Sequence, residues 1–394
     1  MPDGRHFLFI AFNLGVPTGV VYGGSLDSPD RTRLLDGVTD LSYAPGFLLF
    51  VRGTTLLAQP FDPDRLATTG EAVPMVDPIR ASPSSGTAVF GVSNTGVLVY
   101  QATSLSASRL TWFDRAGKSL GVIGERGNYN HVFLSPDRTR VSVSMIEPAG
   151  RRAKKWILDV ARGFRTRFTF DPGDELEGPW SPDGSRIVFN SSRQGHLDLY
   201  QKAASGAGNE ELLWADEVEK SPQSWSSDGR YILYIAQQNA QDLWVLPLFG
   251  DKKPFPLLHT PFTETMGQFS PDGRFVAYVS TESGRAEVYV APFPGPGGKW
   301  PVSTAGGFFP RWRRDGREIF YQAGDGTMMV AAVTTRESTV EVGDVRPLFK
   351  TRTMGSWPYD VSADGQRFLM NTPDEAASVQ PFTLVVNWPA ALKK

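Results

Sequence analysis

Histidine and cysteine, the side chains that most often hold metals or act as nucleophiles, are scarce in this sequence of 394 residues. Cysteine is absent, which excludes disulfides, thiolate metal sites and a cysteine nucleophile. The histidines occupy non-equivalent places relative to the repeat described below, so we expect their side chains to point to different faces. They are His6, His131, His196 and His259. The sequence therefore predicts neither a metal centre nor a bound cofactor.

Charged residues gather in two neighbouring segments. Residues 171–177 contain four acids, but they lack the alternating Asp spacing of a calcium-binding loop. Residues 151–155 contain two arginines and two lysines. We expect both segments to be solvated surface. The net charge of −2 argues against nucleic acid as a partner.

Motifs of catalytic loops are incomplete. The segment Gly23–Asp27 begins like the Gly-x-Ser-x-Gly turn that exposes a serine nucleophile, but it ends in Asp. The segment Gly117–Ser119 has the tail of a phosphate-binding loop, but Trp112 stands where the first glycine is needed. No apolar run approaches the roughly 18 to 20 residues of a membrane span. The sequence predicts a soluble chain without enzymatic activity and without direct membrane insertion.

One short motif recurs along the chain. It marks the repeated structural elements that would position any functional site. It reads Ser-Pro-Asp-Gly or a variant, preceded by an aromatic or apolar residue and followed by an alternating apolar strand. The copies are Ser135–Arg138, Ser181–Gly184, Ser226–Gly229, Ser270–Gly273, Arg313–Gly316 and Ser362–Gly365. Successive Asp residues are 46, 45, 44, 43 and 49 positions apart. A constant period of this length indicates one supersecondary unit repeated many times.

Each repeat is predicted to contain four β-strands. Pro, Asp and Gly make a tight turn, because Pro presets φ, Asp accepts a local hydrogen bond and Gly tolerates positive φ. In one copy, strands are expected at 186–189, 197–200 and near 211–213, after a first strand that ends at Trp180. Helical periodicity is weak throughout. Four strands in about 45 residues are typical of one propeller blade, so the predicted fold class is all-β.

The pattern Trp-Ser-Pro-Asp-Gly-x-x-Ile-x-Phe, followed by Asp-Leu-Tyr or Asp-Leu-Trp, resembles the TolB-type, WD-repeat-like β-propeller repeat. The resemblance covers nearly the whole chain and is more informative about fold than about function. The C-terminal residues 383–394 resemble the ends of propellers found in large bacterial proteins, some of which are membrane-bound serine/threonine kinases. The resemblance implies an extracytoplasmic, periplasmic location if the chain is part of such a protein. No kinase motif occurs in this sequence.

We expect a single propeller over residues 1–394, with eight blades and with seven or nine as alternatives. The first repeat is incomplete, because a Pro-Asp-Gly turn at residues 2–4 opens the chain without a strand before it. Either the chain is a fragment of a longer protein, or ring closure supplies that strand from residues 355–361. The strands expected at 367–370 and 383–387 have no assigned place.

A binding surface is predicted where the chain leads into the first strand of each blade. These positions vary in chemistry from repeat to repeat, whereas the turn motif does not, as expected for a site placed on a repeated frame. The candidate ligand-binding residues are Tyr129, His131, Glu177, Glu219, Glu264, Phe309, Arg311, Trp357 and Tyr359. Acids lie on one side of the ring that these loops form at the channel mouth, and aromatics lie on the other. This distribution predicts a protein, peptide or glycan ligand with a cationic or amphipathic part.

The predicted function is that of a non-catalytic ligand- or protein-binding propeller, acting as a sensor or interaction module of a larger bacterial protein. Two alternatives from other classes remain. One is a propeller lyase or hydrolase for glycans, with its site at the mouth of the channel. The other is the propeller of a prolyl-oligopeptidase-like peptidase that lacks its hydrolase domain.

Overall fold

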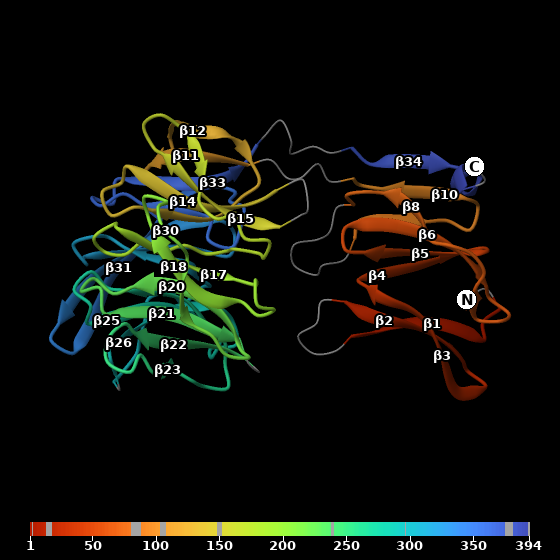
Figure 1. Ribbon diagram of the computed structural model, residues 1–394, viewed down its shortest axis with the longest axis horizontal. Helices are drawn as coiled ribbons and strands as arrows, with labels where there is room; N and C mark the ends of the chain where they lie inside the picture. The colour runs from red at the N-terminus through yellow and green to blue at the C-terminus, as the bar shows by residue number, and fades with distance from the viewer. Residues whose placement is uncertain are drawn as a thin grey trace. The chain divides into compact units, whose positions relative to one another are not determined.

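The chain divides into two compact units in the computed structural model (Figure 1). Unit 1 comprises Met1–Ser106 and Glu375–Lys394, and unit 2 comprises Ala107–Asp374. The structure describes residues 1, 3–12, 18–79, 88–102, 108–147, 152–237, 240–295, 297–374 and 381–392. These residues form β-strands and one short 3-10 helix, η2 (Trp388–Leu392), in agreement with the all-β fold class predicted from the sequence.

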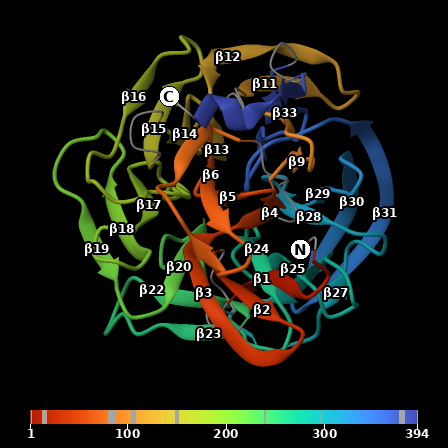
Figure 2. The same ribbon diagram turned by 90° about the vertical axis from the view of Figure 1, so that its right-hand side faces the viewer.

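The described residues of unit 2 form six antiparallel sheets arranged in a ring. In Figure 2 the outermost strands β12, β16, β19, β23 and β31 lie on the rim of this ring. From the inner to the outer strand, the sheets are β32 (Tyr359–Val361), β33 (Arg367–Pro373), β11 (Ser108–Asp114) and β12 (Ser119–Gly127); β13 (Tyr129–Leu134), β14 (Arg140–Ile146), β15 (Ala153–Asp159) and β16 (Arg165–Arg167); β17 (Arg186–Ser191), β18 (Asp198–Ala203) and β19 (Glu211–Trp214); β20 (Glu219–Trp225), β21 (Tyr231–Gln237), β22 (Gln241–Pro247) and β23 (Phe255–Leu258); β24 (Glu264–Phe269), β25 (Phe275–Ser280), β26 (Glu287–Pro292) and β27 (Trp300–Pro301); β28 (Phe308–Trp312), β29 (Glu318–Gln322), β30 (Thr327–Arg336) and β31 (Thr339–Lys350).

Both ends of unit 2 meet in one sheet, which closes the ring. Strand β33 from the C-terminal end of the unit pairs with β11 from its start, in a register that places Leu369 opposite Trp112. Strand β32 then pairs with β33 on the other side. Residues 355–361 were expected to complete the first repeat, but the strand within them completes the sheet of β11 and β12 instead. Residues 367–370 find their place in the same sheet.

Six apolar cores, one between each pair of neighbouring sheets, account for the closed ring within the described residues. Every sheet of unit 2 therefore buries both of its faces. Burial on both faces explains why strands such as β21 and β25 are apolar along most of their length. Residues from the two sides that share each core include Leu110 and Val143, Phe133 and Phe189, Val188 and Tyr234, Leu233 and Tyr278, Val290 and Ile319, and Phe320 and Phe368.

The repeated turn motif has one geometry, which explains its sequence. In the copy at Ser226–Gly229, the Ser226 hydroxyl donates to Asp228 Oδ1 over 2.6 Å and accepts from the Tyr231 amide over 2.9 Å. Gly229 has a φ of +75°, a left-handed conformation that favours glycine. The same Ser–Asp bond occurs four more times, over 2.5 to 2.6 Å. The repeated Asp therefore shapes the turn, as the sequence predicts.

The described residues of unit 1 form three sheets in an open stack. One apolar core joins the first sheet to the second, and another joins the second to the third. Trp388 of η2 lies in the second of these cores, and Val385 of β34 packs against it. Since β34 also pairs with β10, the C-terminal segment is part of unit 1. The sheets are β1 (His6–Phe12), β2 (Gly19–Ser25) and β3 (Ser28–Val38); β4 (Asp40–Ala44), β5 (Phe47–Arg52), β6 (Thr55–Asp62), β7 (Ala67–Thr68) and β8 (Val73–Val76); β9 (Phe90–Val92), β10 (Val97–Tyr100) and β34 (Thr383–Val386).

This organisation differs from the single eight-bladed propeller expected over residues 1–394. The described sheets divide into a closed ring of six and an open stack of three, so the expected blade number is not confirmed. The repeat period predicts how many blades a sequence contains. It does not show where a ring closes, because closure depends on which distant strands pair. Among the described residues, no helix is long and apolar enough to cross a membrane.

Candidate functional site

A cavity of about 390 Å³ lies on the axis of the six-sheet ring of unit 2. All six sheets contribute to it: four through the ends of β13, β20, β24 and β28 and the turns that follow, one through residues 179–182 ahead of β17, and the sixth through Asp360. Five aromatic residues are among those that line it, and only Trp225 of these is more than slightly exposed. They are Phe133, Trp180, Trp225, Phe269 and Trp312.

Three guanidinium groups and one carboxylate line this axial cavity, from Arg138, Arg311, Arg314 and Asp360. The carboxylate is already engaged, because it accepts bonds of 2.8 Å from the amides of Leu134 and of the residue after it in its own strand. The excess positive charge therefore favours an anionic ligand. The sequence instead predicts a ligand with a cationic or amphipathic part.

Arg311 is the most constrained cation of the cavity. Its side chain is only 4% exposed, its Nη1 donates to the carbonyl of Pro310 over 3.1 Å, and its Nε lies 3.5 Å from Asp360 Oδ1. Its Nη2 is buried and has no hydrogen-bond partner among the described residues. Burial lowers the pKa of Arg311, and the charge of Asp360 opposes that shift. A buried donor without a partner is costly, so a ligand that accepts from Nη2 would gain affinity there.

Arg138 reaches the cavity from an unfavourable backbone conformation. It occupies the place that Gly184, Gly229 and Gly273 hold in the other turns, with a φ of +63°. A side chain in this region costs about 1 to 2 kcal/mol relative to glycine. Its Nη1 lies 3.9 Å from Asp360 Oδ2, and its Nε has no hydrogen-bond partner within the described residues. Such local strain is typical of a position retained for its side chain.

The cavity lies at the far ends of the first strands from the loops in which the sequence predicts the site. Of the nine candidate residues, Arg311 alone lines it. Sequence reasoning missed Arg138 and Arg314, although both depart from the repeated motif. Arg138 replaces its glycine, and Arg314 replaces its proline. A departure from an otherwise constant turn is the signal that could have found them.

Four of the candidate residues do come together, around Arg311. Its guanidinium carbon lies 4.3 Å from the centroid of the Trp357 ring and 5.9 Å from that of Tyr359. The Tyr359 hydroxyl donates to the carbonyl of Phe309 over 2.7 Å. Since Trp357 and Tyr359 are buried, they support Arg311 from behind rather than offering a surface of their own.

Two further candidates contact each other in the interior, between neighbouring sheets. His131 Nε2 lies 3.2 Å from Glu177 Oε1, and His131 Nδ1 lies 2.7 Å from the Ser144 hydroxyl. Burial disfavours the charged form of Glu177, but His131, Ser221 and Lys155 together lower its pKa. With both side chains less than 10% exposed, the pair holds the interior of the ring together.

The other three candidates lie apart from these groups. Tyr129 packs in an apolar core, and its hydroxyl donates to the Glu125 carbonyl over 2.7 Å. Glu264 is buried, and burial raises its pKa although the Thr260 hydroxyl donates to it over 2.6 Å. Glu219 is exposed. In their contacts, the nine residues therefore fall into separate groups: one around Arg311, the pair of His131 and Glu177, and three that lie apart.

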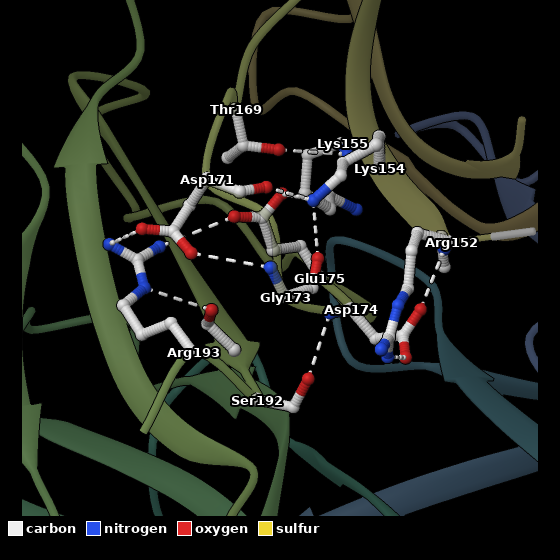
Figure 3. A network of polar contacts seen from close by, with 12 residues as sticks. Arg152, Lys154, Lys155, Thr169, Asp171, Gly173, Asp174, Glu175, Ser192 and Arg193 are labelled. Atoms are coloured by element: carbon white, nitrogen blue, oxygen red, sulfur yellow. Dashed lines mark hydrogen bonds and ion pairs between the residues drawn. The ribbon is translucent and has the colours of Figure 1, made fainter. Parts of the chain in front are cut away.

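The acidic and basic segments, expected to be solvated, face each other and are largely buried (Figure 3). Glu175 is fully buried and lies 3.3 Å from Lys154 on one side and 3.3 Å from Arg193 on the other. Lys154 also donates to the carbonyls of Asp171 and Gly173. The expectation of two solvated faces is therefore wrong for these residues, because the charges neutralise each other between two sheets. Arg151 lies outside the described residues.

Lys155, next in the chain, is enclosed without a hydrogen-bond partner among the described residues. Burial lowers the pKa of Lys155 to about 7, although Glu177 and Glu175 oppose the shift. No group of three or more His, Cys, Asp or Glu side chains that could hold a metal is found in the part of the chain that the structure describes. Lys154, Glu175 and Arg193 of this network link the sheet of β13–β16 to that of β17–β19.

Among the described residues, the closed ring of radial sheets, five with four strands and one with three, surrounds an axial cavity and defines unit 2 as a β-propeller. Residues 122–248 match the family model of the TolB beta propeller domain. This part of the propeller is therefore similar to the TolB type, as the turn motif predicts.

Other known proteins are similar to parts of this chain. The Tol-Pal system protein TolB of Helicobacter pylori is 24% identical over 156 residues, which cover 38% of this chain and 36% of that protein. The match thus spans about a third of the relative's length. A solved structure described as TolB from Agrobacterium tumefaciens has a TM-score of 0.53 at 16% identity and covers 68% of this chain and 98% of that one. TolB from Acinetobacter baumannii has a TM-score of 0.45 at 15% identity, covering 85% of this chain and 78% of that one.

Proposed function

We propose that unit 2 is a non-catalytic binding module that takes a carboxylate-bearing peptide segment of a partner protein into its axial cavity. The observation that carries the proposal is the unpartnered Nη2 of Arg311, buried beside the cavity. A carboxylate is the acceptor that best fits a guanidinium, and two such groups from Arg138 and Arg314 lie on the same wall.

The size of the cavity and one partly exposed ring favour a peptide over a small inorganic anion. Trp225 offers rigid apolar area that a phosphate or sulfate cannot use. Gln223 adds a buried side-chain oxygen, Oε1, which has no hydrogen-bond partner among the described residues and can accept from a peptide amide. Similarity to a protein of the Tol-Pal system supports a role in protein binding, and the sensor role within a larger bacterial protein is part of the same proposal.

The test is a peptide display selection on the whole chain, followed by binding measurements on the enriched peptides. We expect enrichment of peptides that combine an Asp, Glu or free C-terminal carboxylate with an aromatic residue. The affinity should fall by roughly tenfold or more in Arg311→Gln and in Arg138→Gly, because each removes one cation from the cavity.

Arg186→Gln is the matched control, since Arg186 is a half-exposed arginine of the same ring that does not line the cavity. This variant should bind like the unaltered chain. The proposal fails if no acidic peptide is enriched, or if both cavity variants bind the enriched peptides as well as the control does. Turnover of a bound peptide or glycan would instead favour an enzyme.

A further inference from the structure

Three successive boundaries between neighbouring sheets of unit 2 have a charged residue on each side. In each sheet, the residue eight positions after the turn Asp pairs with one residue on its inner side and one on its outer side. These residues are Met145, Ser191, Ala236 and Ser280. By this register, the outer partner in one sheet is matched with the inner partner in the next. The three pairs are Lys154 with Glu175, Asp198 with Lys220, and Asp242 with Glu264.

At the first two boundaries the charges are opposite, and a lysine ammonium fills the site. Lys154 Nζ lies 3.3 Å from Glu175 Oε2, and Lys220 Nζ lies 3.0 Å from Asp198 Oδ1. Each ammonium also donates to two backbone carbonyls, which belong to the residues two and four positions before the inner partner. These carbonyls are those of Gly173 and Asp171 around Lys154 (Figure 3), and those of Val218 and Asp216 around Lys220.

The third boundary has an acid on both sides, Asp242 and Glu264, and each is only 2% exposed. Asp242 Oδ1 and Glu264 Oε2 are buried and have no hydrogen-bond partner among the described residues. The other oxygens are engaged, since His259 Nδ1 lies 2.8 Å from Asp242 Oδ2 and the Thr260 hydroxyl donates to Glu264 Oε1 over 2.6 Å. Burial raises the pKa of Glu264, the Thr260 hydroxyl opposes that shift, and the negative charge of Asp242 adds to it.

The carbonyls that complete the two ammonium sites have counterparts at the third boundary. The residues two and four positions before Glu264 are Phe262 and Thr260, and neither carbonyl accepts a hydrogen bond within the described residues. This boundary therefore has the acceptors that surround Lys154 and Lys220, but it has no ammonium of its own. Buried carboxylate oxygens without a donor or a counter-charge are costly, so a cation that pairs with them would be stabilised.

We propose that the third boundary binds the primary ammonium group of a ligand between Asp242 and Glu264. An ammonium has three N–H donors and one positive charge, which match two carboxylates and the nearby carbonyls. The site lies directly beneath the surface, because the side chain of His259 is 62% exposed and Phe262 is 43% exposed. The ligand is a lysine side chain of a partner or a free alkylamine. The site shares no residue with the axial cavity and does not depend on the function proposed for it.

The test is calorimetric titration of the whole chain with two amine probes. One is butylammonium, and the other is a peptide with a single lysine, blocked at both ends so that it has no carboxylate for the axial cavity. We expect saturable binding of at least one probe. Tighter binding of the peptide would assign the site to a lysine of a partner, and tighter binding of butylammonium to free amines. If neither probe binds, or if tetramethylammonium or Ca²⁺ binds in their place, the proposal is wrong.

Two variants test the acceptors directly. Glu264→Lys supplies the ammonium from within the chain, as Lys220 does at the preceding boundary, so it should raise the Tm of unit 2 and abolish amine binding. Glu264→Gln keeps the size of the side chain and removes one charge, so the affinity for the amine should fall roughly tenfold or more. A lower Tm in Glu264→Lys, or an unchanged amine affinity in either variant, would overturn the proposal.

Glu217→Lys is the matched control. It makes the same change of charge as Glu264→Lys, at an exposed residue in the corresponding segment of the preceding sheet. This variant should bind the amine probe and melt like the unaltered chain. If it loses amine binding as Glu264→Lys does, the binding depends on net charge rather than on the site between Asp242 and Glu264, and the proposal fails.

Discussion

The guanidinium carbon of Arg311 lies 4.3 Å from the centroid of the Trp357 ring, across the boundary between two neighbouring sheets of unit 2. The ring shields one face of the guanidinium from water, and a cation over an indole is favourable. Because Trp357 is itself buried, Arg311 is held in place before any ligand arrives. A preorganised cation gives more affinity than a mobile one, since less ordering is needed on binding.

The first prediction separates binding from stability at this position. In Arg311→Met, a flexible apolar side chain replaces a buried cation, while Asp360 keeps its two amide donors. The free energy of unfolding should therefore change by less than about 1 kcal/mol or increase, because removing a poorly satisfied buried charge is often neutral or stabilising. Urea unfolding and peptide binding on the same sample check this. A large loss of stability would mean that Arg311 is structural.

The second prediction concerns the turn glycines, which have φ values of +71°, +75° and +72° at Gly184, Gly229 and Gly273. Changing any of them to Ala should lower the free energy of unfolding by about 1 to 2 kcal/mol, because an L side chain is strained there. Gly343→Ala is the control, since this glycine has no positive φ and an added Cβ would meet nothing closer than 3.6 Å. Equal effects at all four sites would contradict the geometry of the turn.

Arg138→Gly makes the complementary change in the same turn. It restores the residue that suits a φ of +63°, so unit 2 should be as stable as before or more stable by about 1 kcal/mol, while the cavity loses a cation. Thermal melting together with peptide affinity measures both effects. A variant that loses stability and keeps its affinity would show that the strain at Arg138 does not serve binding.

The third prediction concerns two unfolding transitions, one for each unit. Trp388 is 1% exposed, and its ring centroid lies 5.1 Å from that of Phe47 within unit 1. Trp388→Ala should destabilise unit 1 by about 3 to 5 kcal/mol, because it empties a core site. Calorimetry should show one transition moved to lower temperature and the other unchanged. A single transition that moves as a whole would show that the units unfold together.

The fourth prediction follows from the pKa of Lys155, which burial lowers from 10.5 to about 7. Between these two values the unfolded chain binds more protons than the folded chain, so the free energy of unfolding must rise with pH. From pH 7 to pH 9 the rise attributable to Lys155 is about 2 kcal/mol.

Lys155→Met provides the comparison, because it removes the titrating amine and keeps the apolar stem. The transition of unit 2 in urea should become less dependent on pH over the same range in this variant. An identical slope in the variant and in the unaltered chain would mean that another group titrates there.

The sequence by itself determined the repeating unit and its turn. Serine, aspartate and glycine at Ser226, Asp228 and Gly229 make contacts within six residues, so their spacing alone is sufficient to specify the turn and, with the apolar strands around it, an all-β propeller. Local hydrogen bonds of this kind do not depend on what packs against them. For the same reason, the sequence correctly predicted that the repeated Asp is structural.

Tertiary structure alone decided where the ring closes and where its cavity lies. Closure depends on the pairing of β33 with β11, which lie more than 250 residues apart in the sequence. No local sequence pattern indicates which strands pair at this distance. Likewise, Glu175 and Lys154 look like solvated charges in sequence, but packing between two sheets buries them together. Arg138, Arg311 and Asp360 belong to three different sheets, so their convergence on one axis depends on the rotation between sheets. That rotation is set by the packing of whole sheet faces rather than by any short segment.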